Sequence, residues 1–237
     1  YEAYQFSFIR LDEAKKLYDE IKKVCGNLKL NEADTADSAS DNRIVISIYG
    51  GSGSGKTTIA AALQQYFLND NTACYVLTGD NYPHRIPMRN DEERLNVYNE
   101  SGEDGLRGYL GTPEEIDFDR INKELSEFKA GKDIIEIKHM GREDGDISYD
   151  ETDFTGIKVL ILEWTHGGSE YLKGVDIPVF LESSPEETKA RRIKRGRDEN
   201  AASPFICRVV ELEQEKLDLQ GKNARIVVGK DGKVYEQ

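Results

Sequence analysis

The sequence has 237 residues, and its 45 acidic against 32 basic side chains give a formal net charge of −13 at pH 7. This length allows one or two domains with a substantial hydrophobic core. The acidic balance disfavours nucleic acids and anionic membrane surfaces as partners, because both are bound through clustered Lys and Arg. The sequence has no apolar run long enough to span a bilayer and no recognisable secretory leader, so we expect a cytoplasmic protein.

The few cysteines and histidines disfavour a disulfide framework and a zinc site. Cys25, Cys74 and Cys207 lie far apart and form no C-x-x-C pair, which is typical of reduced thiols. The three histidines are not spaced like metal ligands. One of them, His166, precedes two glycines and is interpreted as a loop residue without a catalytic role. A zinc enzyme is therefore not expected.

Residues 1–42 are predicted to be a helix followed by a linker. Apolar residues recur at steps of three and four between positions 11 and 29, which is typical of an amphipathic helix. Residues 31–42 contain no large apolar side chain and are expected to form a flexible linker. We expect this segment to precede a main domain at residues 43–237. The helix either packs against that domain or couples it to a missing partner module.

From residue 43 onward, short β-branched runs alternate with helical stretches. Strands are expected at residues 44–49, 74–77, 134–137, 159–162, 177–181 and 226–228. Helices are expected at residues 57–67, 113–128, 185–194 and 204–219, the second opened by a capping box of Thr112 and Glu115. The acidic residues 143–153 are interpreted as a solvated loop. This alternation predicts an α/β fold with a parallel sheet covered by helices on both faces.

The strongest motif is GGSGSGKTT at residues 50–58, which fits G-x-x-x-x-G-K-[ST] between a strand and a helix. Its glycines let backbone N–H groups surround phosphate oxygens, and the helix N-terminus adds positive potential. We expect Lys56 to reach the β- and γ-phosphates and the Thr57 hydroxyl to ligate Mg²⁺. The sequence has no guanine-reading NKxD tetrad, so ATP and Mg²⁺ are the expected cofactors. The expected nucleotide contacts are Gly51, Ser52, Gly53, Ser54, Gly55, Lys56, Thr57 and Thr58.

Two acidic residues each follow a predicted strand of this sheet. Asp80 comes after the second strand and Glu163 ends the strand at residues 159–162. Ligands of open α/β sheets bind beyond the carboxyl ends of the strands, so both carboxylates are expected near the γ-phosphate. Asp80 could accept the proton of an attacking hydroxyl, and Glu163 could orient Mg²⁺.

Basic residues cluster near residue 194 of this otherwise acidic chain. Residues 191–197 read RRIKRGR, and guanidinium groups suit the charge of a transferring phosphoryl group. The cluster supplies Arg192 and Arg195 as expected catalytic residues and Arg191 and Arg197 as expected nucleotide contacts. A solvated charged face is the simpler alternative for this run.

Together these segments resemble the uridine kinase and phosphoribulokinase family of P-loop kinases, from residue 43 to the C-terminus. The matching pieces are residues 50–58, 78–82, 112–118, 162–163 and 191–197. The resemblance implies a three-layer sandwich with a mainly five-stranded parallel sheet and an arginine-rich lid over ATP. It also implies that Asp80 is the catalytic base, that Glu163 assists Mg²⁺, and that the protein forms a homo-oligomer.

The sequence departs from the family pattern in the segments that would bind the acceptor. Uridine kinases carry a Tyr-Asp-Phe…His stretch that reads the pyrimidine, whereas this sequence has KHMGRED at residues 138–144. Trp164 also stands where those kinases have Gly after the Walker-B acid. The expected acceptor-binding residues are Tyr82, His84, Arg85, Arg107, His139 and Arg142. Their cationic character favours a small anionic or sugar-like acceptor. A uridine/cytidine kinase, and a nucleotide-sensing or ATPase domain that regulates a missing partner, are the alternatives.

Overall fold

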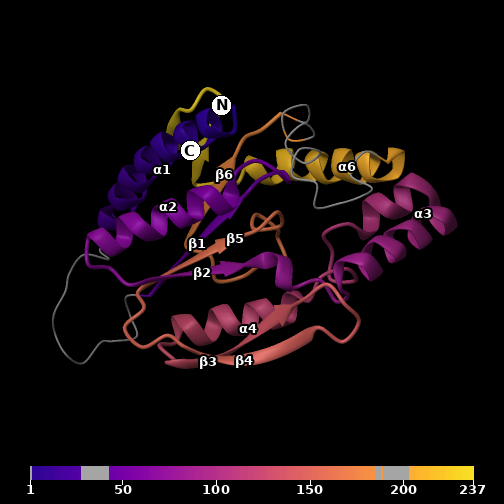
Figure 1. Ribbon diagram of the computed structural model, residues 1–237, viewed down its shortest axis with the longest axis horizontal. Helices are drawn as coiled ribbons and strands as arrows, with labels where there is room; N and C mark the ends of the chain where they lie inside the picture. Colours follow the sequence, from indigo (N-terminus) through magenta and orange to yellow (C-terminus); the bar gives the residue numbers. More distant parts are fainter. Residues whose placement is uncertain (1, 28–42, 185–187, 189–202) are drawn as a thin grey trace.

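The computed structural model describes residues 2–27, 43–184, 188 and 203–237 (Figure 1). Among these residues, six strands form one sheet in the order β2-β5-β1-β6-β7-β8. Their bounds are β1 (Ile44–Tyr49), β2 (Cys74–Thr78), β5 (Val159–Glu163), β6 (Ile177–Leu181), β7 (Ile226–Val228) and β8 (Val234–Glu236). The first five strands in this order pair in parallel and β8 is antiparallel to β7. The predicted five-stranded parallel sheet is therefore confirmed, with one antiparallel strand added at its edge.

The strand expected at residues 134–137 lies outside this sheet, so its placement in the parallel sheet was wrong. It is part of β3 (Ile134–Met140), which pairs antiparallel with β4 (Ile147–Asp153) in a separate two-stranded sheet. The solvated loop expected at residues 143–153 is also wrong over the length of β4. Most side chains of β4 are exposed, so the strand carries no apolar alternation that a sequence pattern could reveal.

The helices flank the main sheet on both faces. Side chains at alternate positions of β1 point to opposite faces, as a strand requires. Ile44, Ile46 and Ile48 pack with α2 (Lys56–Asn69), whereas Val45 packs with α4 (Phe118–Lys129). Tyr49 on the α4 side packs against Leu217 of α6 (Pro204–Gly221). This arrangement is the predicted three-layer sandwich. The helix expected at residues 185–194 lies outside the described residues.

The start of α4 differs from its prediction. The helix begins at Phe118, and the Asp117 carboxylate accepts a hydrogen bond from the Arg120 backbone N–H at 3.1 Å. The predicted Thr112–Glu115 capping box is wrong because the Glu115 side chain turns into the protein interior, where it is 1% exposed. Glu115 binds other groups there, and these belong to the site described below.

A long helix, α3 (Pro87–Tyr109), was not predicted. It is 23 residues long but buries only three of them, Asn90, Leu106 and Tyr109. Its backbone also departs from helical geometry at Gly102, where φ is 66°. A helix with so small a buried face carries little of the apolar periodicity on which sequence prediction depends. It follows the short turn η1 (Gly79–Asn81) and projects from the sheet (Figure 1).

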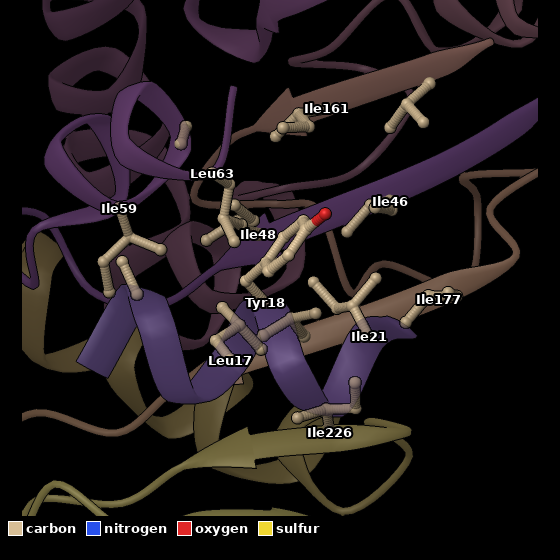
Figure 2. Close-up of a cluster of buried hydrophobic side chains, with 14 of the residues drawn as sticks. Leu17, Tyr18, Ile21, Ile46, Ile48, Ile59, Leu63, Ile161, Ile177 and Ile226 are labelled. Atoms are coloured by element: carbon tan, nitrogen blue, oxygen red, sulfur yellow. The ribbon is translucent and has the colours of Figure 1, made fainter. Parts of the chain in front are cut away.

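The N-terminal helix, α1 (Glu2–Asn27), packs against the main sheet. Figure 2 shows Leu17 and Ile21 of α1 among Ile46, Ile177 and Ile226 of three strands. Leu17 and Ile21 are fully buried. Of the two expected roles of this helix, packing against the main domain is the one that the structure shows. The predicted linker at residues 31–42 lies outside the described residues.

None of the helices in the described ranges has the length and apolar character that a bilayer span requires.

Candidate active site

The glycine-rich segment after β1 forms a tight loop that leads directly into α2. Gly53 and Gly55 have φ angles of 90° and 98°, a conformation that residues with a side chain rarely adopt. The ammonium group of Lys56 donates hydrogen bonds to the carbonyl oxygens of Gly50 and Gly51 at 3.0 and 3.1 Å. The charge of Lys56 therefore lies over the loop that the motif assigns to phosphate.

Two buried hydroxyl groups next to this loop have no hydrogen-bond partner among the described residues. They belong to Ser54 in the loop and to Ser183 just after β6. A Cβ atom on Gly51 would come within 3.3 Å of the Ser183 hydroxyl and within 2.8 Å of Gln214 Oε1 on α6. Buried hydroxyls normally have a partner, so donors of this kind fit a ligand with acceptor oxygens such as a phosphate.

A cavity of about 290 Å³ is lined in part by Ser183, the residue whose hydroxyl faces Gly51 of the loop. Its other lining residues are Phe180, Glu182, Asp218, Gly221, Lys222, Lys230 and Gln237. The cavity is large enough for part of a nucleotide, at the lower end of the usual size of small-molecule sites.

The predicted pair of carboxylates lies where adjacent strands end. Thr78 of β2 is in register with Glu163 of β5, and Asp80 follows two residues later in η1. The Thr57 hydroxyl donates a hydrogen bond to Glu163 Oε2 at 3.1 Å. Burial and the nearby Asp80 raise the pKa of the Glu163 carboxyl, and Lys56, Thr78 and Thr57 oppose this shift. Glu163 is buried, whereas Asp80 is exposed and accessible to a substrate.

Trp164 accounts for the shape of the turn that carries Asp80. Its buried indole packs so closely on Gly79 that a Cβ atom there would lie 1.9 Å from Trp164 Cγ. The indole also contacts the rings of Tyr82 and Phe118, with centroids 6.2 and 5.6 Å away. The tryptophan that departs from the uridine kinase pattern thus supports the backbone immediately before Asp80.

Of the expected acceptor-binding residues, Tyr82 is part of the core. Its side chain is fully buried, and its hydroxyl donates a hydrogen bond to the Glu124 carboxylate. The assignment of Tyr82 to the acceptor is therefore corrected, because a side chain enclosed in this way cannot contact a ligand. Its ring supports the Trp164 indole instead.

The expected cationic residues of the acceptor site are largely paired. Arg107 forms ion pairs with Glu103 and Glu215. Arg85 donates to the Tyr109 hydroxyl at 3.2 Å and lies 3.6 Å from Glu93. These contacts already engage the guanidinium groups that an anionic acceptor would need as binding partners.

The remaining expected acceptor residues are spread over two segments. His84 Nε2 lies 2.9 Å from the Pro113 carbonyl oxygen, and His139 lies 3.9 Å from the Asp150 carboxylate. Arg142 is exposed in the loop between β3 and β4. The four arginines Arg191, Arg192, Arg195 and Arg197 lie outside the described residues, so their expected roles stay predictions.

A polar network on the α3 side of the site was not predicted from the sequence. We define this α3–α6 network as Asn90, Arg94, Glu115, His166 and Glu213. Glu115 accepts hydrogen bonds from Asn90 at 2.9 Å, from Arg94 Nε at 2.6 Å and from the Gly111 N–H at 2.6 Å. Arg94 also donates to Glu213 Oε1 at 3.0 Å and thereby joins α3 to α6.

The α3–α6 network also holds the segment after Asp80 in place. The Glu115 carbonyl oxygen accepts a hydrogen bond from the His84 N–H at 3.0 Å, and Pro83 forms a β-bridge with Ile116. Burial pushes the pKa of the Glu115 carboxyl upward, but Arg94, His166, Gly111 and Asn90 outweigh it and lower the pKa overall. Glu115 is therefore a charged anchor inside the protein.

His166 completes the network from the loop after β5. Its ring stands edge-on to Trp164 at 5.4 Å, and a Cβ atom on Gly111 would lie 2.9 Å from its Nδ1. Burial lowers the pKa of this imidazole, against the opposing effect of Glu213 and Glu115. Its position three residues after Glu163, at the carboxyl edge of the sheet, is the one sequence signal that could have marked it.

Comparison with known proteins identifies relatives of the whole chain and of its central part. The model of the Phosphoribulokinase / Uridine kinase family matches residues 45–211. A bifunctional alpha-galactosidase/sucrose kinase from Mediterraneibacter gnavus is 69% identical over 237 residues, which are 100% of this chain and 24% of that protein. A uridine kinase from Brevibacillus brevis is 30% identical over 168 residues, 68% of this chain and 70% of that protein.

Solved structures agree on the fold. A phosphoribulokinase from Rhodobacter spheroides superposes with a TM-score of 0.59 at 14% identity and covers 79% of this chain and 70% of its own. The family match confirms the family resemblance that was predicted from residues 50–58 and their neighbours, and the superposition confirms the fold. The chain belongs to the phosphoribulokinase/uridine kinase family.

Proposed function

We propose that this chain transfers the γ-phosphoryl group of ATP to a hydroxyl group of a neutral sugar, with sucrose as the first candidate. The observation that carries the proposal is the arrangement of Lys56, Asp80 and Glu163 at one edge of the sheet. The relative that is 69% identical over the whole chain is named as a sucrose kinase in part. This chain spans only 24% of that relative, so the acceptor is taken from it as a proposal.

The phosphate side of the site supports ATP and Mg²⁺. Residues 51–58 would surround the phosphates, with Lys56 as a donor together with the hydroxyls of Ser54 and Ser183, which have no partner among the described residues. The hydroxyl of Thr57 and the carboxylate of Glu163 are hard oxygen ligands of the kind Mg²⁺ prefers, and they already lie 3.1 Å apart. The ion would neutralise phosphate charge when bound.

Asp80 is the base that we propose for the transfer. Its carboxylate would accept the proton of the acceptor hydroxyl while that oxygen forms a bond to the γ-phosphorus and the bond to ADP breaks. Trp164 and Gly79 hold the turn that carries it. Arg192 and Arg195 remain the proposed stabilisers of the transferring group.

A neutral acceptor fits this site better than an anionic one. Arg85 and Arg107 are paired with carboxylates, and Arg94 lies between Glu115 and Glu213. An anion would have to compete with these pairs, whereas sugar hydroxyls can donate to carboxylates without displacing them. We therefore set the anionic alternative aside and retain the sugar-like one.

A uridine/cytidine kinase is the second candidate, because the Brevibacillus brevis relative carries that name at 30% identity. The absence of the pyrimidine-reading stretch at residues 138–144 argues against it. We keep the homo-oligomer and the cytoplasmic location as proposals as well.

The test is ADP release measured with sucrose, its component hexoses, sugar phosphates, hydroxy acids and uridine as acceptors. We expect turnover with sucrose or another neutral sugar and little with the anions. Efficient turnover of uridine alone would establish the second candidate. Full ATP hydrolysis without any acceptor would instead indicate an ATPase domain.

The role of Asp80 is tested separately by Asp80→Asn. We expect kcat to fall about 10²–10⁴-fold, the usual contribution of general acid–base catalysis, with ATP affinity retained. Asp104→Asn, an exposed change on α3, is the matched control. Loss of ATP affinity with normal residual turnover would show that Asp80 binds the metal ion or stabilises the fold.

A further inference from the structure

Three members of the α3–α6 network are partly exposed, namely Arg94, His166 and Glu213, whereas Asn90 and Glu115 are buried. The Glu115 side chain is 1% exposed, whereas the Glu213 side chain is 13% exposed. His166 is also partly exposed. The network thus has a buried anchor and an accessible edge, and the edge consists of the Glu213 carboxylate, the Arg94 guanidinium that is 15% exposed and committed to both carboxylates, and the His166 imidazole.

The two carboxylates differ in how much of their hydrogen-bonding capacity is used. Glu115 accepts from Asn90, Arg94 and the Gly111 N–H, so both of its oxygens are engaged. Glu213 accepts from Arg94 through Oε1, and this is its one hydrogen-bond donor within the described ranges. A carboxylate can accept about four hydrogen bonds, so Glu213 retains capacity for a ligand.

This accessible edge lies close to the turn that carries the proposed base, because the His166 ring stands edge-on to Trp164 at 5.4 Å and the Trp164 indole packs on Gly79, the residue before Asp80. His166 interacts electrostatically with Asp80 as well as with Glu213, Glu115 and Arg94. The residue after Glu213 on α6 is Gln214, whose side chain packs against the loop at Gly51. A molecule that presents a hydroxyl to Asp80 therefore has Glu213 and His166 nearby.

We infer that Glu213 and His166 bind hydroxyl groups of the acceptor, with Arg94 holding Glu213 in place. The ligand class is a neutral polyhydroxyl compound such as a sugar ring. A carboxylate accepts from hydroxyls, and an imidazole can both donate and accept. This inference rests on the proposed function and names the residues that would select the acceptor.

The charges around the site support a neutral ligand. Asp80, Glu115 and Glu213 lie near His166, and Arg94 and the partly buried Lys216 are the cations beside them. Burial lowers the pKa of His166, which favours a neutral imidazole near pH 7. A phosphate or carboxylate on the acceptor would meet these carboxylates without an uncommitted cation among the described neighbours of His166.

The experiment compares Glu213→Gln with Glu211→Gln, two identical substitutions on one helix. Glu211 is exposed and pairs with Arg208, so it serves as the control. We expect Glu213→Gln and His166→Ala to raise the KM for the sugar about 10-fold or more, the scale of a lost hydrogen bond to a charged group. The KM for ATP should stay at its wild-type value in these variants. The melting temperature of Glu211→Gln should also stay at the wild-type value.

Deoxy sugars identify the contact itself. A sugar that lacks the hydroxyl bound by Glu213 should be a poor acceptor for the wild type, and Glu213→Gln should cause no further loss with it. Equal loss with every deoxy sugar, or equal KM values for Glu213→Gln and Glu211→Gln, would overturn the inference. A wild type that phosphorylates no sugar would instead overturn the proposed function, so the two failures are distinguishable.

Discussion

The two halves of the candidate site are built in opposite ways. The phosphate side is a single run of sequence, residues 50–58, whose loop conformation follows from its own glycines. The proposed acceptor side is the α3–α6 network, which brings together residues from positions 90 to 213 in four separate segments. The first depends on local backbone geometry, and the second depends on the whole fold being in place.

This difference predicts where mutations act. Phosphate-side residues such as Lys56 contact the loop and contribute little to the core, so their loss should affect catalysis alone. Network residues such as Glu115 have buried partners, so their loss should destabilise the protein as well.

Among the variants that compare the two halves of the site, Lys56→Ala is expected to have the largest effect on catalysis. We expect kcat to fall about 10²–10³-fold or more, because the variant lacks the cation that stabilises charge on the transferring phosphoryl group. Its melting temperature should match that of the wild type. ADP release and thermal unfolding of the same sample measure both, with Lys123→Ala on the exposed face of α4 as the control. Comparable activity in a folded Lys56→Ala protein would contradict the assignment of the phosphate side.

The same difference explains what the sequence could predict. The loop at residues 50–58, Asp80 and Glu163 each follow a strand with a clear apolar pattern, so their position at the carboxyl edge of the sheet was predictable. The placement of β3 was not predictable, because an isolated apolar run does not specify its pairing partner. The role of Glu115 was predicted wrongly because Thr-x-x-Glu is a helix-capping pattern, whereas here the side chain turns inward to Arg94.

An intermediate effect is expected for Glu115→Ala, which tests the acceptor side. The substitution leaves Arg94, Asn90 and the Gly111 N–H without their buried acceptor. Removing one partner of a buried ion pair typically costs about 3–5 kcal/mol of unfolding free energy. Chemical denaturation measures this cost, and Glu114→Ala, an exposed neighbour, is the control. A loss no greater than that of the control would show that the network does not support the fold.

The smallest expected effect is a pH dependence that identifies Glu115 as the charged anchor. Its carboxyl has a pKa below the usual 4.5 because Arg94, His166, Gly111 and Asn90 together outweigh burial. An acid whose pKa is lower in the folded state contributes stability above its unfolded pKa, and that contribution is lost as the pH falls through the folded pKa. The unfolding free energy of wild type minus that of Glu115→Gln should therefore be largest at neutral pH and shrink on acidification below about pH 4.5.

Other titratable groups near Glu115 also affect how stability changes with pH. Glu213 and Lys216 face Glu115 from α6, and His166 faces it from the loop after β5. His166 has a pKa below 6.5, so its protonation on acidification also reduces stability, and because Glu115 raises the pKa of His166, the size of this contribution differs between the wild type and Glu115→Gln. His166→Ala and the double variant His166→Ala/Glu115→Gln separate this contribution, because the Glu115 difference should persist without the imidazole. A difference that grows on acidification would mean that the folded pKa of Glu115 is raised and that burial outweighs the network.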